Sequence, residues 1–141
     1  MNQKTLFTLS IILLGFTMQA QSIIGQWETY DDKTNEKKAI IEIYKQDDTY
    51  GAKIIKNFVR NKDAVCDKCE GENKNKPIIG LVIIENIKKN NEAYEEGTIL
   101  DPESGDVYKC YLKLIEENKL KVRGYIGFSL IGRTQYWLRK K

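Results

Sequence analysis

The hydrophobic residues of this chain alternate with a period of two. In Val107–Glu116, one face carries Tyr108, Cys110, Leu112 and Leu114, and lysines and Tyr111 occupy most of the other. This alternation predicts a β-strand with one buried and one solvated face. Further strand-like stretches rich in β-branched and aromatic residues are found at 39–46, 50–56, 98–100, 120–126 and 133–139. The chain is therefore predicted to be all-β.

Turn-forming residues separate these strands. Asp47-Asp48 and Glu117-Asn118 each predict a hairpin between neighbouring strands. Asp101–Gly105 (DPESG) predicts a hairpin loop, because proline presets φ at the second turn position and glycine accepts a positive φ. Leu81–Ile87 is ambiguous: its β-branched residues favour a strand, whereas the spacing of its hydrophobic residues would also suit a short helix.

The strand after Glu117-Asn118 has two distinct faces. Leu120, Val122 and Ile126 are expected on the buried face, and Arg123 on the opposite one. Gly124 shares the buried face, where a missing side chain permits a bend or a close approach.

The order of the elements predicts how the sheet closes. No strand–helix–strand rhythm occurs, so a parallel sheet is not expected. About eight short strands with tight connections predict a small closed antiparallel meander barrel, whose closure removes exposed sheet edges. A barrel of eight strands is just wide enough to be filled by side chains or to hold one small ligand.

The N-terminus has the three parts of a secretory signal peptide. Lys4 precedes an apolar run, Leu6–Phe16, which is too short to span a bilayer, and Ala20 provides a small residue at the cleavage site. Cleavage after Ser22 is the alternative. We expect residues 1–20 to be a signal peptide, residues 21–141 to form one domain, and the mature protein to be periplasmic or secreted, without a membrane span.

Composition excludes several kinds of chemistry. The chain contains no histidine, which excludes Ser-His-Asp and Cys-His catalysis and histidine-ligated zinc. The net charge is only +3 and the basic residues are interspersed with acidic ones, so no nucleic-acid surface is predicted. We therefore expect no enzyme activity, no cofactor and no metal.

A long connection at 59–79 contains Cys66-Asp67-Lys68-Cys69. In an exported protein, a Cys66–Cys69 disulfide is the favoured interpretation. A bond from either residue to Cys110 is the alternative, although Cys110 lies among inward-facing leucines. A zinc site lacks a fourth sulfur, and redox chemistry of the thioredoxin type lacks the helix that would stabilise a thiolate.

Gly25-Gln26-Trp27 opens the first strand of the mature chain. This Gly-x-Trp resembles the opening motif of the calycins, which include the lipocalins and fatty-acid-binding proteins. The resemblance implies that Trp27 closes the base of the barrel and that a basic residue near the end of the chain packs across it. Arg139 is preferred to Arg133 for this role.

The mature chain also resembles an exported bacterial family of unknown function, domain of unknown function 2147. The matching segments are Gly25-x-Trp27, Cys66-x-x-Cys69, Pro77–Leu81, Gly97–Cys110, Leu120–Gly127 and Gly132–Arg139. The resemblance implies a lipocalin-like barrel in a Gram-negative envelope and leaves its activity open.

Two functions are compatible with such a barrel. The first is a binding module for a small apolar or amphipathic ligand, with Tyr50, Tyr108, Cys110 and Gln135 as candidate polar contacts. The second is a module with a filled core that interacts with an envelope protein through its surface. An apolar cavity of about 300 Å³ or more with convergent polar groups would favour the first function.

Overall fold

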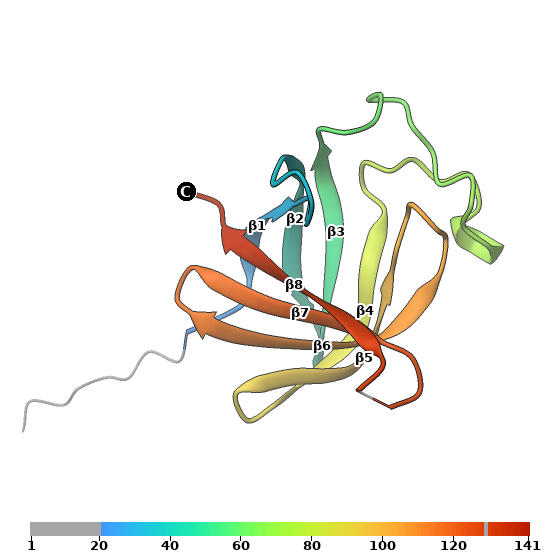
Figure 1. The fold of residues 1–141 in the computed structure, drawn as a ribbon. Coiled ribbons are helices and arrows are strands. Elements are labelled where there is room, and N and C mark those ends of the chain that lie inside the picture. The colour runs from blue at the N-terminus through green and yellow to red at the C-terminus, as the bar shows by residue number, and fades with distance from the viewer. Residues whose placement is uncertain (1–20, 129) are drawn as a thin grey trace, which may run out of the picture.

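The protein is an eight-strand antiparallel barrel, seen in a computed structural model that describes residues 21–128 and 130–141 (Figure 1). The predicted signal peptide, residues 1–20, lies outside the described residues. The strands are β1 (Gly25–Tyr30), β2 (Lys37–Gln46), β3 (Thr49–Asn57), β4 (Val82–Asn90), β5 (Ala93–Leu100), β6 (Val107–Glu116), β7 (Lys119–Tyr125) and β8 (Gly132–Arg139). Each strand pairs with the next and β8 pairs with β1, which confirms the predicted closed meander.

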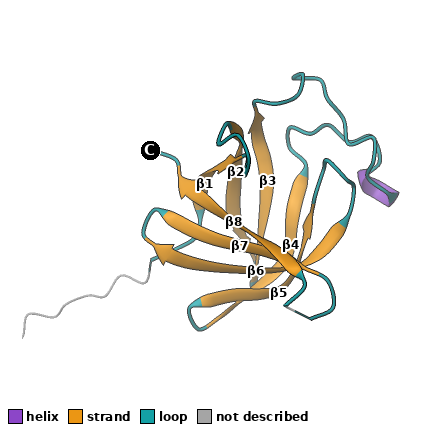
Figure 2. Cartoon of the chain, in the orientation of Figure 1, coloured by secondary structure: helices purple, strands orange, loops and turns teal. Residues whose placement is uncertain are grey.

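Within the described residues, the barrel is built almost entirely of strands and loops (Figure 2). A single short 3-10 turn, η1 (Gly71–Asn73), lies in the long β3–β4 connection. No helix in this part of the chain has the length and apolarity needed to cross a bilayer.

The two ends of the barrel differ in their connections. At one end, two-residue turns join β2 to β3, β4 to β5 and β6 to β7, and Asp47 and Asn91 in these turns adopt positive φ. At the other end, longer loops join the remaining strands, at 31–36, 58–81, 101–106 and 126–131. We call these the closed end and the open end.

The ambiguous segment is a strand that contains an irregularity. Ile84 and Ile87 are both buried although β4 is extended, and Leu81 is buried directly before this strand. Asn86 has a φ of 56°, and the pairing register of β3 with β4 shifts between Ile84 and Ile87. The local distortion allows residues three positions apart to face inward, and this explains why their spacing suited a helix.

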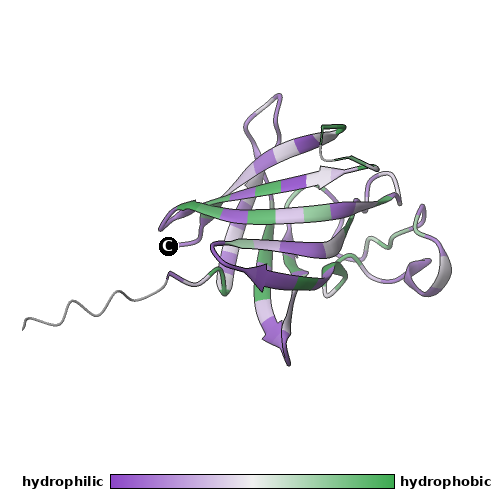
Figure 3. Ribbon diagram, turned by 90° about the horizontal axis from the view of Figure 1, so that it is seen from below, coloured by the Kyte–Doolittle hydropathy of each residue, from purple (hydrophilic) through white to green (hydrophobic). Residues whose placement is uncertain are grey.

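The predicted strand faces agree with burial for most positions. Cys110, Leu112, Leu120 and Val122 are buried, and hydrophobic and polar residues alternate along the strands (Figure 3). The expectation for Ile126 was wrong: this residue is 61% exposed. The reason is that β7 ends one residue earlier, so Ile126 lies in the loop at the open end.

Candidate ligand-binding cavity

Trp27 seals the closed end of the barrel. Its side chain is fully buried and its Nε1 donates a hydrogen bond of 2.8 Å to the carbonyl of Ile23. The guanidinium carbon of Arg139 lies 4.3 Å from the centre of the Trp27 ring, so Arg139, rather than Arg133, covers the tryptophan. The same guanidinium donates to the backbone carbonyls of Ser22, Ile24 and Glu117. Arg139 thereby connects the residues before β1, the β6–β7 turn and the last strand.

A cavity of about 490 Å³ occupies the half of the barrel nearer the open end. Its apolar walls include Ile41, Ile54, Ile78, Ile83, Ile99 and Val122. The volume exceeds the roughly 300 Å³ at which pockets begin to accommodate small molecules. Side chains therefore fill the interior at the closed end, near Trp27, and the interior is hollow towards the open end.

The charged groups of the cavity lie at its rim. Lys38 forms an ion pair of 2.7 Å with Glu103, which connects β2 to the β5–β6 loop. Arg133 is paired with Asp32, which connects β8 to the β1–β2 loop. This pairing raises the pKa of Arg133. These charged residues lie at the rim, and the lining residues deeper in the cavity are apolar or neutral.

Two of the four predicted contact residues line this cavity. Tyr108 lies near the rim, where its hydroxyl donates to Asp106 at 3.3 Å, and Gln135 lies on the wall formed by β8. Gly124 lines the cavity between them. Arg123, on the other face of β7, donates to the hydroxyl of Thr134.

Tyr50 and Cys110 are not among the described residues that line the cavity. Tyr50 packs edge-to-face against Tyr94, with 5.0 Å between the ring centres. Cys110 is a fully buried free thiol, and burial raises its pKa to about 12. It pairs across the sheet with Gly97 and Gly124, so its side chain belongs to the core.

Trp137 is a cavity residue that the sequence analysis did not select. It is 3% exposed and lines the cavity, and its Nε1 has no hydrogen-bond partner in the described structure. The sequence did indicate which face of β8 carries Trp137, because Arg133, Gln135 and Trp137 alternate on one face of this strand. Local alternation alone did not show that a cavity lay in front of that face.

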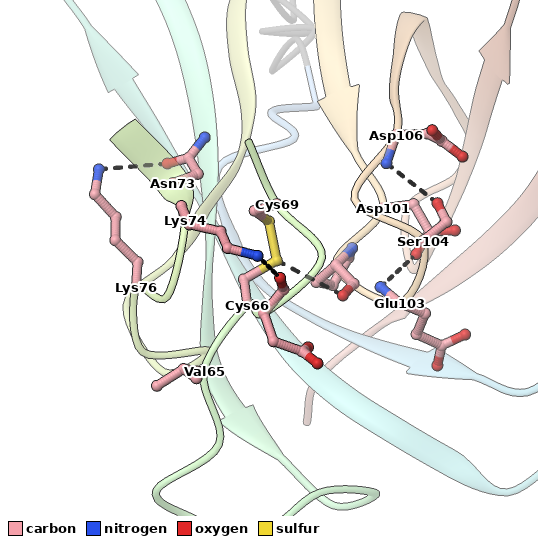
Figure 4. Close-up of a disulfide and its surroundings, with 12 residues drawn as sticks. Val65, Cys66, Cys69, Asn73, Lys74, Lys76, Asp101, Glu103, Ser104 and Asp106 are labelled. Atoms are coloured by element: carbon pink, nitrogen blue, oxygen red, sulfur yellow. Dashed lines mark hydrogen bonds between the residues drawn. A yellow bond between two sulfur atoms is a disulfide. The ribbon is translucent and has the colours of Figure 1, made fainter. Parts of the chain in front are cut away.

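The predicted disulfide joins Cys66 to Cys69, whose Cα atoms are 5.3 Å apart (Figure 4). Both residues are fully buried although they lie in a loop. Sγ of Cys66 contacts the carbonyl oxygen of Pro102 at 3.7 Å, in the hairpin loop that begins at Asp101. In that loop Gly105 has a φ of 80° and donates its N–H to the carbonyl of Asp101.

The disulfide loop also forms part of the cavity. Backbone hydrogen bonds join Cys66 to Lys76 and Ala64 to Ile78, which holds the loop in a narrow, folded-back arrangement. Ile78 from this loop is a buried cavity residue, and Arg60, near the start of the loop, lies at the rim. The β3–β4 connection is therefore one side of the mouth rather than an appendage.

The β7–β8 loop adds exposed apolar side chains to the same mouth. Ile126 and Ile131 line the cavity at its rim, and both are more than half exposed. Phe128 and Leu130 are 81% and 90% exposed. An apolar surface of this kind beside an apolar cavity is typical of a binding entrance.

These features define a lipocalin-like protein, that is, a closed eight-strand antiparallel barrel with one sealed end and an apolar cavity. The chain belongs to the family described as "Uncharacterized protein conserved in bacteria (DUF2147)", which matches residues 25–139.

The fold is similar to that of protein HP1028 from the human pathogen Helicobacter pylori, which is described as belonging to the lipocalin family. The TM-score is 0.75 at 15% sequence identity, over 85% of this chain and 84% of the other. This likeness concerns the fold. The comparison with curated proteins finds no match.

Proposed function

We propose that this protein is an exported, non-enzymatic carrier that binds a small apolar or amphipathic molecule inside its barrel. The observation that carries the proposal is the cavity of about 490 Å³, with isoleucine-rich walls and a few neutral polar groups. Ligand sites commonly combine apolar walls with a small number of placed polar groups. Ile126 and Ile131 add exposed apolar side chains to the rim at which such a molecule would enter.

Export to the periplasm or the cell exterior is part of the proposal. The signal-like residues 1–20 and the Cys66–Cys69 disulfide support it, since disulfides persist in oxidising compartments. Contacts at the closed end favour cleavage after Ala20. Ile23 is fully buried and the carbonyl of Ser22 accepts a hydrogen bond from Arg139, so a chain beginning at Ile23 would place a charged terminus at a buried residue. The intact mass of the exported protein should match that of a chain that begins at Gln21.

The cavity can be tested with a dye and an occluding substitution. N-phenyl-1-naphthylamine, a neutral dye that brightens in apolar sites, should bind the mature protein. Ala39 lines the cavity, so Ala39→Phe should fill part of it and weaken dye binding by at least tenfold. Thr98→Phe adds the same ring at an exposed position outside the cavity and should leave binding unchanged. Equal binding by all three proteins would contradict the proposal.

The second candidate function is interaction with an envelope protein through the surface. The exposed apolar side chains of the β7–β8 loop favour it. Native mass spectrometry of protein purified from its own host distinguishes the two functions. A small molecule retained by the folded protein supports the carrier, whereas a co-purifying protein that is lost with Phe128→Ser supports the interaction module.

A further inference from the structure

We propose that the outer face of β6, β7 and β8 is a docking surface for an acidic polysaccharide, that is, for a chain of sugar rings that carry negative groups. Six residues define this surface, which we call the basic face: Lys109, Tyr111, Lys113, Lys121, Arg123 and Tyr136. None of the six is among the described residues that line the cavity. The inference is therefore independent of the carrier function, and only the choice of a polysaccharide rests on the proposed export.

The fold brings together residues of the basic face that are separated in the sequence. The strands β6, β7 and β8 lie side by side in the barrel (Figure 1). Lys113 of β6 pairs with Lys121 of β7, which pairs in turn with Tyr136 of β8. In the next row, Tyr111 pairs with Arg123. Because these positions alternate with buried residues along each strand, their side chains point outward from the barrel wall.

The pair of Lys113 and Lys121 places two like charges directly opposite each other. Side chains at such positions have Cβ atoms roughly 4.5–5.5 Å apart, and like charges there are destabilising. Neither lysine forms an ion pair among the described residues. A negative group bound between the two ammonium groups would remove their repulsion. The fold therefore holds an uncompensated positive charge at one defined place on its wall.

Elsewhere on the wall, ion pairs across neighbouring strands compensate the lysines. These pairs connect β1 to β2, β2 to β3 and β4 to β5, and they are Glu28–Lys37 at 2.6 Å, Glu42–Lys53 at 3.3 Å and Lys88–Glu96 at 3.5 Å. In β6, β7 and β8 the only acidic residue is Glu116, which is the last residue of β6. The basic face therefore has an excess of positive charge, which is complementary to a negatively charged partner.

The extent of the basic face favours a polymer over a small anion. Lys109 and Lys113 are four residues apart on β6, which corresponds to about 13 Å of extended chain. A single exposed ion pair contributes little to binding, so a stable complex requires several such contacts at once. A chain with regularly repeated negative groups provides these contacts, and linkage makes their contributions cumulative.

Tyr111 and Tyr136 add aromatic rings between the cations. Tyr136 is 49% exposed, and the ammonium group of Lys119 lies 4.9 Å from the centre of its ring. The face of an aromatic ring is partly negative and attracts the C–H groups of a sugar ring as well as cations. Bases of single-stranded nucleic acid also stack on such rings, but an exported protein meets polysaccharides. A bilayer has no rings to stack, and the exposed apolar side chains that could enter it lie on the β7–β8 loop instead.

Binding of decagalacturonate, a sugar chain with a carboxylate on every ring, tests the proposal. We use a protein that comprises residues 21–141 at about 0.02 M salt, where screening is weak. The double variant Lys113→Gln/Lys121→Gln should weaken binding at least about fivefold. Lys62→Gln/Lys68→Gln removes the same charge from two exposed lysines of the β3–β4 connection and should change the affinity less than about twofold. The neutral methyl ester of the same sugar chain should bind at least about tenfold more weakly than the acid.

Two single variants separate loss of binding from loss of folding. Lys121→Glu replaces the like-charge pair with opposite charges, which are stabilising across strands. Its melting temperature should be at least that of the wild type, and it should bind decagalacturonate more weakly than Lys121→Gln, because the new carboxylate repels the sugar chain. Tyr136→Ser removes a ring without changing the charge and should weaken binding about threefold.

The outcomes distinguish the surface, its partner and the carrier function. Equal weakening by the two double variants would show attraction by net charge alone and would overturn the basic face as the site. A Lys121→Glu protein that binds as well as the wild type would overturn it too. Tighter binding of decathymidylate or of phosphatidylglycerol vesicles, at about 0.15 M salt, would overturn the polysaccharide as the partner. Dye binding by the cavity should be the same in Lys113→Gln/Lys121→Gln as in the wild type, so the carrier function is tested separately.

Discussion

Replacing Arg139 by alanine should destabilise the closed end of the barrel. The guanidinium makes three hydrogen bonds to backbone carbonyls, at 2.8, 3.0 and 3.2 Å, and stacks on the ring of Trp27. The stacking contributes roughly 0.5–2 kcal/mol and each hydrogen bond about 1 kcal/mol, with less than full additivity because the groups are partly exposed. We expect Arg139→Ala to lower the free energy of unfolding by about 2–4 kcal/mol.

Arg133 provides a matched control for this prediction. It is an arginine of the same strand, but its side chain is 63% exposed and pairs with a single carboxylate, Asp32. Exposed ion pairs contribute about 0–1 kcal/mol, so Arg133→Ala should have a small effect. Arg139→Lys keeps the charge but not the planar fork, and should recover only part of the loss.

Urea unfolding of a protein that comprises residues 21–141, followed by circular dichroism, measures these differences directly. For a domain of this size, the melting temperature of Arg139→Ala should also fall by about 6–15 °C. The reasoning would be refuted by a loss below about 1 kcal/mol for Arg139→Ala, or by an equal loss for Arg133→Ala.

Three further predictions concern the loops and the free thiol. An added Cβ at Gly105 would lie 2.0 Å from the carbonyl oxygen of Lys68, whereas at Gly71, which also has a positive φ, it would meet no atom within 4 Å. Gly71→Ala should therefore lower the free energy of unfolding by roughly 1–2 kcal/mol, and Gly105→Ala should lower it by at least twice as much, as measured by urea unfolding. Reducing the loop disulfide should lower the free energy of unfolding by only about 2 kcal/mol and leave the β-sheet circular dichroism spectrum unchanged. Dye binding should weaken, because the loop that carries Ile78 is then less firmly held. Loss of the β-sheet spectrum on reduction would contradict this prediction. Burial raises the pKa of Cys110 from 9.0 to about 12 in the folded protein, so this thiol leaves the free energy of unfolding unchanged below pH 9 and lowers it as the pH rises from 9 towards 12. Between pH 7 and pH 10 the wild type should lose about 1 kcal/mol more of its free energy of unfolding than Cys110→Ala, and equal losses would exclude this linkage.

Local sequence rules predicted the strands and most of their faces. Leu112 and Leu120 are buried as expected, because alternation follows from the covalent geometry of an extended chain. The Cys66–Cys69 disulfide was also favoured from the residues, since short sequence separation keeps the two thiols close. The same local rules failed at Ile126, where the strand ended one residue earlier than the pattern suggested.

Local sequence rules do not predict distortions within a strand. The three-residue spacing of Ile84 and Ile87 is compatible with both a strand and a helix, and the pairing of this segment with β3 shows that it is a strand. The local hydrophobic pattern cannot show where a partner strand will tolerate a change of register, because that depends on residues distant in the chain.

The sequence by itself determined an all-β chain, its turns, its lack of histidine chemistry and the disulfide favoured for its loop. Only the tertiary structure decided that the barrel is hollow at one end, that Trp137 lines this cavity, and that the disulfide loop forms one side of the mouth. The physical reason is that strand faces follow from neighbours along the chain. A cavity instead depends on the summed side-chain volumes and hydrogen bonds of strands that meet only after the barrel has closed.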